Sequence, residues 1–202
     1  MEIRLYIEGG GNSKDTKSFL LQGFRGFLRD LVSEARSRRI QWRPVMCGPR
    51  QAAFDAFRIA LRQHPDALNV LLVDAEGPVQ DTPWRHLGQR DGWECNGWPD
   101  DQCHLMTQAM EAWFIADIAT LATFYGVGFN PNSIPKNPDV EQVAKIQLET
   151  SLKAATRGTQ KGESHQIYHA SRLLAVIDAT TVRRASRHCD RLFTAFEIMM
   201  KQ

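Results

Sequence analysis

The apolar residues in the first part of the chain follow the patterns of strands. Apolar and polar positions alternate over residues 2–7, which predicts a strand with one face in the core. An almost unbroken apolar segment at 69–73 predicts a strand buried on both faces, as in a parallel sheet. A further strand is expected at 40–47, where Pro44 favours an edge position.

Amphipathic helices are expected between these strands. The first would begin near Ser13 or Asp15 and run to about Arg38, and the second would cover residues 50–63. The order β-α-β-α-β is typical of an α/β domain with right-handed crossovers. We therefore expect a small parallel sheet flanked by helices.

The rest of the chain is expected to be mainly loops and helices. Glycine and proline mark the loops, and apolar periodicity marks the helices, in the order loop 79–103, strand 104–110, helix 111–125, loop 126–139, helix 140–156 and helix 170–201. This order suggests two parts. An α/β core would cover residues 1–125, and a basic helical C-terminal extension would cover 126–202 and pack on the core.

The composition is typical of a globular protein. Hydrophobic residues make up 43% of the 202 residues and charged residues 24%. No apolar segment reaches the roughly 18 residues needed to span a bilayer, and the N-terminal residues lack a signal-peptide pattern. We therefore expect a cytoplasmic protein without a membrane partner.

The cysteine spacing matches no paired zinc pattern, so reduced thiols are expected. The alternative is a metal site that gathers His86, Cys95, Cys103 and His104.

Charge is distributed unevenly along the chain. Residues 1–144 carry 15 Lys+Arg and 18 Asp+Glu, a net charge of −3, whereas residues 145–202 carry 10 and 5, a net charge of +5. An acidic first part and a basic second part fit a metal site beside a polyanion-binding surface. The alternative is an ordinary solvated basic helix face.

Three acids follow two of the predicted strands. Glu8 comes directly after the first strand, and Asp74 and Glu76 come directly after the third. Ligands of parallel α/β sheets bind beyond the carboxyl ends of the strands, so these acids should share one edge. Crowded carboxylates repel one another unless a cation joins them, and oxygen ligands suit Mg²⁺ or Mn²⁺. The alternative role is capping and turn formation.

Glu111 is a candidate fourth member of the catalytic group. It lies within a strongly apolar segment, where a lone carboxylate is costly unless it is paired or bound to metal. A salt bridge to an arginine is the alternative. The glycines at 9–11 lack the spacing of nucleotide-binding motifs and would leave room for substrate to approach the metal.

Basic residues of the second part are candidates for nucleic-acid binding. Arg157, Lys161, His165 and His169 could contact phosphate or backbone. The two histidines are also spaced to share a helix face, so a zinc pair and plain surface polarity are alternatives.

Two further sets are compatible with nucleic-acid binding. A helical basic stripe is expected from Arg183, Arg184, Arg187 and Arg191. Four tryptophans could either stack on bases or pack in the core: Trp84, Trp93, Trp98 and Trp113.

The strand–Glu8–Gly and strand–Asp74-x-Glu76 segments resemble the acid layout of the Toprim domain of topoisomerases, primases and several nucleases. The segment at 110–114, MEAWF, is similar to the Glu-x-Trp segment of small Toprim-related defence proteins. Toprim domains usually carry Asp-x-Asp, so Asp-x-Glu is a departure that changes the geometry of any metal site.

Nearly the whole chain resembles an uncharacterised bacterial family of about this length that is placed in the Toprim-like group. The stretches that carry the resemblance are IEGGGN at 7–12, LVDAE at 72–76, PWRHL at 83–87, RDGW at 90–93, DDQCHLM at 100–106, PKNPDVE at 135–141 and TRGTQKGE at 156–163. The resemblance implies a gene that often lies beside an ATPase gene in presumed phage-defence loci.

Two functions follow as hypotheses. The first is a Mg²⁺- or Mn²⁺-dependent nuclease, or another phosphodiester-cleaving enzyme, that acts on DNA or RNA in phage defence with Glu8 as general acid or base. The alternative is a non-enzymatic Toprim-like partner subunit of an ATPase.

Overall fold

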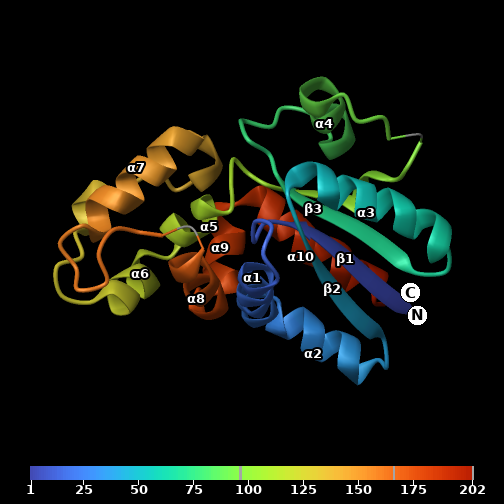
Figure 1. The fold of residues 1–202 in the computed structure, drawn as a ribbon, viewed down its shortest axis with the longest axis horizontal. Helices are drawn as coiled ribbons and strands as arrows, with labels where there is room; N and C mark the ends of the chain where they lie inside the picture. The colour runs from blue at the N-terminus through green and yellow to red at the C-terminus, as the bar shows by residue number, and fades with distance from the viewer. Residues whose placement is uncertain (96, 166, 202) are drawn as a thin grey trace.

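The apolar segment that suggested a doubly buried strand forms β3 (Leu68–Asp74) in the interior of a sheet. The computed structural model describes residues 1–95, 97–165 and 167–201. In this part of the chain the sheet has four strands in the order β2-β1-β3-β4, and every neighbouring pair is parallel (Figure 1). The other strands are β1 (Glu2–Glu8), β2 (Gln41–Gly48) and β4 (Cys103–Met106). The predicted parallel α/β sheet is confirmed.

β2 lies at one edge of the sheet, as Pro44 suggested. Pro44 pairs in register with Leu5 of β1. Proline has no N–H to donate to a strand on its other side, so an edge position costs it no ladder bond.

Helices cover both faces of the sheet and form the C-terminal region. They are α1 (Lys14–Phe27), α2 (Arg29–Ser37), α3 (Arg50–Gln63), α4 (Pro83–Asp91), α5 (Glu111–Ala116), α6 (Ile118–Tyr125), α7 (Lys145–Thr156), α8 (Tyr168–Val176), α9 (Ala179–Ala185) and α10 (Arg187–Met199). Short 3₁₀ turns are η1 (Asp100–Gln102), η2 (Pro131–Ser133) and η3 (Val140–Gln142).

Alternate residues of the central strands face two separate hydrophobic clusters. Ile3, Leu5 and Ile7 of β1 pack in a cluster with side chains of α1, α2 and α10. Tyr6 and Leu71 face the other cluster, which contains side chains of α3 and α4. Figure 1 shows α3 and α4 on one side of the sheet and α1, α2 and α10 on the other. The first cluster also includes residues of α5 to α9, so the C-terminal helices share a core with the sheet.

Several helix boundaries differ from the predictions, and at three of them a polar side chain caps a new helix inside an apolar period. The helix expected to run to about Arg38 ends at Phe27, and Leu28 separates α1 from α2. Asp117 caps α6 by accepting the N–H of Thr120, which divides the helix expected at 111–125. Capping residues work locally, whereas the apolar period continues across them.

The same cause divides the expected helix at 170–201 into α8, α9 and α10. Asp178 caps α9 and Ser186 caps α10. The loop expected at 79–103 is also wrong in part, because it contains α4, with Pro83 in its first turn. Across the described residues, no helix is both long and apolar enough to cross a membrane.

Candidate metal centre

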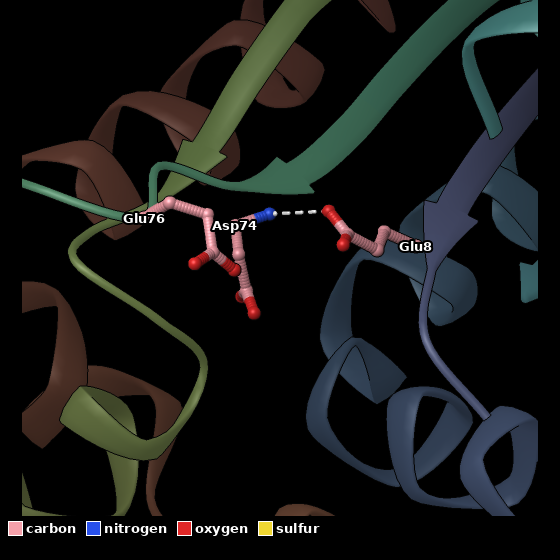
Figure 2. A group of neighbouring side chains, drawn as sticks. All are labelled: Glu8, Asp74 and Glu76. Carbon is pink, nitrogen blue, oxygen red and sulfur yellow. Dashed lines mark hydrogen bonds between the residues drawn. The ribbon is translucent and has the colours of Figure 1, made fainter. Parts of the chain in front are cut away.

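The acids that follow β1 and β3 converge at the carboxyl edge of the sheet. One carboxylate oxygen each from Glu8, Asp74 and Glu76 lie within 4.8 Å of one another. Figure 2 shows Glu8 reaching from β1 toward the two acids at the end of β3. All three residues are partly buried. Such a group of oxygen ligands could hold a metal ion.

Glu8 is held in place by a bond to the neighbouring strand and by an arginine. Its Oε2 accepts the backbone N–H of Asp74 at 3.0 Å and a guanidinium N–H of Arg50 at 3.1 Å. Arg50 is the first residue of α3, and it also donates to the Asp74 carbonyl and to the carboxylate of Asp91 at 2.7 Å. One side chain therefore ties β1, β3 and the end of α4 together. No pattern in the sequence distinguishes Arg50 from the other arginines.

Asp74 is fixed from the opposite direction. Its Oδ1 accepts the N–H of Met110 at 3.0 Å, immediately before α5 begins at Glu111. This bond draws the start of α5 toward the acids. Glu111 therefore lies near Asp74, although it is outside the group of three.

Glu76 adopts a left-handed backbone conformation with φ 64°. This region is uncommon for a residue with a side chain and costs free energy. The conformation is held by a bond from the Glu76 N–H to the Gln108 carbonyl at 2.7 Å. The turn carries the Glu76 carboxylate back toward Asp74 (Figure 2).

Lys145 supplies a positive charge beside the acids. Its Nζ lies 2.5 Å from Oε1 of Glu76, and a guanidinium nitrogen of Arg90 lies 3.8 Å from Oε2. The backbone N–H of Lys145 donates to the Gln108 side chain at 3.2 Å. Burial alone would lower the pKa of Lys145, but Glu76, Asp74 and Glu111 raise it, so the side chain stays charged. The contact joins α7 to the end of β3, which no pattern in the sequence could indicate.

Burial and mutual repulsion disfavour the ionised form of the carboxylates in the centre. Burial raises the pKa of Glu8, with a smaller rise from Glu76, although Arg50 and the Asp74 N–H lower it. The pKa of Asp74 is raised well above its usual value, first by burial and then by the charges of Glu111 and Glu8. A bound cation would relieve both effects by favouring the ionised carboxylates.

Glu111 has a raised pKa, caused mainly by burial. The positive charge that lowers this pKa is that of Lys145, an ammonium, rather than the arginine of the salt-bridge alternative. Glu111 also lines a small cavity of about 20 Å³ together with Glu149, Ser164 and His165. The structure thus places His165 on the same side of the molecule as the acids.

The candidate nucleic-acid residues are placed in different ways. Arg157 forms an ion pair with Glu163 at 2.9 Å. The Nζ of Lys161 lies 5.2 Å from the centre of the Phe124 ring. The Nδ1 of His169 accepts the His165 N–H at 3.2 Å. None of these residues belongs to the acidic group.

Neither zinc alternative finds a site of three ligands among the described residues, where the three acids form the only group of three or more potential ligands. His104 is fully buried, and burial lowers its pKa to about 3, with a further lowering by Arg191. His86 Nε2 is bonded to the Ala75 carbonyl at 2.8 Å. Burial raises the pKa of Cys103, which keeps the thiol protonated.

Three of the four arginines of the expected stripe bind other protein groups, whereas Arg184 is exposed. Arg183 pairs with Asp190 and Glu197 at 2.7 and 2.6 Å. Arg191 donates to the Cys103 carbonyl at 2.8 Å, and Arg187 donates to the Val79 carbonyl at 3.0 Å.

Most of the candidate tryptophans pack inside the protein. Trp84, Trp93 and Trp113 are buried, and Trp93 stacks on Phe54 with ring centres 4.1 Å apart. Trp98 is partly buried and packs against the same cluster. Packing rather than stacking on bases is therefore their role here.

Glu141 is a buried acid that sequence analysis missed. Its carboxylate accepts the Ser186 hydroxyl at 2.7 Å, the His188 N–H at 2.8 Å and the His188 ring at 2.7 Å. Burial would raise its pKa, but the bonds from His188 and Ser186 lower it overall. Glu141 lies in η3 and fastens that turn to the start of α10.

Comparison with known proteins gives a family but no characterised relative. No curated protein and no solved structure gives a significant match. One family model, described as Domain of unknown function (DUF4276), matches residues 7–197 and so covers both the sheet and the C-terminal helices. The resemblance to an uncharacterised family is confirmed, and the chain belongs to the DUF4276 family.

Proposed function

We propose that this protein is a Mg²⁺- or Mn²⁺-dependent phosphodiesterase that cleaves DNA or RNA. The observation that carries the proposal is the convergence of Glu8, Asp74 and Glu76 at the carboxyl edge of a parallel sheet. This edge is the usual ligand-binding position of such sheets. The layout is similar to that of the Toprim domain and supports, by analogy, an effector role in phage defence.

The donor set fits a hard divalent cation. All three side chains offer oxygen, and no cysteine or histidine belongs to the group. The pKa values of Glu8 and Asp74 are raised by burial and by neighbouring carboxylates, although Arg50 and Lys145 lie beside the acids, so a further cation would be favoured there. A bound Mg²⁺ or Mn²⁺ would supply Lewis-acid chemistry by neutralising charge that develops on a phosphate.

The protein's own groups would divide the remaining work. Glu8 has its Oε2 fixed by Arg50 and the Asp74 N–H, which leaves Oε1 to bind metal or to take a proton from an attacking water. A raised pKa suits a carboxylate that must take up a proton at neutral pH. Lys145, which lies beside Glu76, would bind the phosphate group of the substrate.

The test is cleavage of plasmid, single-stranded and RNA substrates in the presence of Mn²⁺ or Mg²⁺. Wild type should cleave at least one of them, and Asp74→Ala and Glu8→Gln should reduce the rate by at least about 100-fold. Asp66→Asn, an exposed acid away from the centre, is the matched control and should keep the wild-type rate. Equal cleavage by wild type and Asp74→Ala would point to a contaminating nuclease and reject the proposal.

A second candidate is a non-enzymatic Toprim-like partner subunit of an ATPase. It is favoured by the Lys145–Glu76 pair, because a built-in ammonium lets the acids stay together without metal. This candidate predicts co-purification with an ATPase and no cleavage by either the isolated protein or the complex.

A further inference from the structure

Two aromatic rings lie exposed and side by side where α1 packs against α8. Phe19 of α1 is 44% exposed and Tyr168 of α8 is 58% exposed. Their ring centres are 6.3 Å apart in an edge-to-face arrangement. Single exposed apolar residues are common on protein surfaces, but adjoining large rings indicate a contact surface.

The two rings are mounted on helices that pack unusually closely. A Cβ atom at Gly23 of α1 would lie 2.6 Å from the Ser171 carbonyl, and one at Gly26 would lie 2.6 Å from the Ala175 Cα. The Ser171 hydroxyl donates to the Phe19 carbonyl. The close approach fixes α1 against α8, so the rings are pre-organised at little cost in entropy.

A chain of contacts leads from these rings to the acids. The Tyr168 ring centre lies 5.2 Å from that of His165, which is also exposed. His165 and Glu111 line the same small cavity, and Glu111 is close enough to Asp74 to raise its pKa. Figure 1 shows α1 and α8 lying together beside α5, the helix that begins at Glu111.

Positive charge borders the same surface. Arg172 of α8 is exposed. The pKa of His169 is lowered first by burial and then by His165, Arg172 and Lys161, so the charges of Arg172 and Lys161 lie near that ring. Lys161 also lies over the Phe124 ring. Flat rings with bordering cations fit a ligand that has both flat faces and a polyanionic backbone.

We propose that Phe19, Tyr168 and His165 form a stacking platform for unpaired bases, so that the protein binds single-stranded DNA or RNA. In a duplex the faces of the bases are covered by their neighbours, whereas a single strand can splay its bases onto aromatic rings. The platform would lead the strand toward the acids. The inference that the metal centre acts on single strands specifies the substrate of the proposed function and rests on that proposal.

The test measures binding apart from cleavage. Fluorescence anisotropy in EDTA would compare a labelled strand of about 12 nucleotides, as DNA and as RNA, with the same strand in a duplex. Wild type should bind the single strand more tightly. The double variant Phe19→Ala/Tyr168→Ala should weaken single-strand binding by at least about tenfold. Tyr168→Phe keeps the ring and should keep the affinity.

The matched control is Ile198→Ala, because Ile198 is a large apolar residue of similar exposure, 53%, but lies on α10. Its affinity should equal that of wild type. The proposal is overturned if the duplex binds as tightly as the single strand, if wild type binds neither, or if the double variant binds as well as Ile198→Ala. Loss of binding to phosphatidylglycerol vesicles with unchanged oligonucleotide binding would assign the rings to a membrane surface and also overturn it.

The outcome for the platform is separate from the outcome for cleavage. If no variant or wild-type protein cleaves but the double variant loses single-strand affinity, the platform stands and the nuclease proposal fails. If Asp74→Ala abolishes cleavage while the double variant binds normally, the platform fails and the nuclease proposal stands.

Discussion

The ammonium of Lys145 lies 2.5 Å from the carboxylate of Glu76, which joins α7 of the C-terminal region to the end of β3. The same ammonium is close enough to Asp74 and Glu111 that their charges raise its pKa. Lys145 therefore offsets part of the repulsion among acids that would otherwise need a metal ion.

Replacing Lys145 should make the protein more dependent on metal. In Lys145→Met the acids lose their nearest cation, so we expect the metal-free protein to lose about 1 kcal/mol, the usual scale for a partly exposed pair. Added Mn²⁺ should then raise the Tm of the variant by more than it raises that of wild type. Lys153→Met, on the same helix, is the control. Equal stabilisation of the two proteins by Mn²⁺ would contradict this role.

Asp74→Asn should separate metal binding from folding. Removing one of several crowded charges should leave the metal-free protein as stable as wild type or more stable, because burial and like charges already disfavour the Asp74 carboxylate. Isothermal titration with Mn²⁺ should show at least about tenfold weaker binding. Urea unfolding in EDTA measures the stability. Unchanged Mn²⁺ affinity would show that Asp74 does not bind the metal.

Metal binding should strengthen as pH rises. The carboxyl groups of Glu8, Asp74 and Glu111 have raised pKa values, so protons compete with the cation at mildly acidic pH. We expect Mn²⁺ affinity to rise as pH increases through the raised pKa values of these carboxyl groups, with protons released on binding. Titration in buffers of different ionisation enthalpy counts those protons, and Asp74→Asn should release fewer. A pH-independent affinity would contradict the raised pKa values.

The same groups predict the pH dependence of the metal-free protein. A carboxyl whose pKa is higher in the folded state binds protons more tightly there than in the unfolded chain. Its contribution therefore favours folding below the ordinary carboxyl pKa and is lost as pH rises through the raised value. In EDTA, the difference in free energy of unfolding between Asp74→Asn and wild type should grow as pH rises through that window.

Arg50 should be important for stability as well as for the site. It contacts Glu8, the Asp74 carbonyl and Asp91, and its side chain is only 15% exposed. Arg50→Ala leaves two partly buried carboxylates without their partner, and we expect a loss of about 2–4 kcal/mol in urea unfolding. Arg85→Ala removes an arginine that is 71% exposed and paired with Asp81 just before α4, so it should change stability by less than about 0.5 kcal/mol.

Glu141 should act as a structural acid rather than a catalytic one. Glu141→Gln would lose the charge that His188 and Ser186 stabilise, and we expect a loss of about 2 kcal/mol. Because these bonds lower the pKa of Glu141, its stabilising contribution is present above the ordinary carboxyl value and falls as pH drops through the lowered one. Nuclease activity per folded molecule should stay at the wild-type level, and loss of activity without loss of stability would contradict this role.

The sequence was sufficient for the features that depend on local pattern. The alternation at 2–7 and the apolar run at 69–73 predicted β1 and β3, because a strand's two faces repeat with a fixed period. Pro44 predicted an edge strand through its missing donor. The topology of parallel crossovers then placed Glu8 and Asp74 on the same edge of the sheet.

Local pattern was less informative where short polar side chains interrupt an apolar period. Asp117 and Ser186 each cap a new helix, yet their neighbours keep the spacing of one continuous helix. The capping bond depends on a backbone conformation that the apolar period does not record. Helix boundaries were therefore the weakest part of the sequence-based description.

Only the tertiary structure decided which distant side chains complete the centre. Arg50 reaches Glu8, Lys145 reaches Glu76, and His165 shares a cavity with Glu111, because separate elements pack so that long side chains meet. The pairing of Phe19 with Tyr168 likewise depends on the close contact of α1 and α8. The strands, and the edge of the sheet that carries the acids, could be predicted because periodicity and connectivity are properties of the local chain. The charges and rings around those acids depend on packing between elements far apart in the chain, which no local pattern encodes.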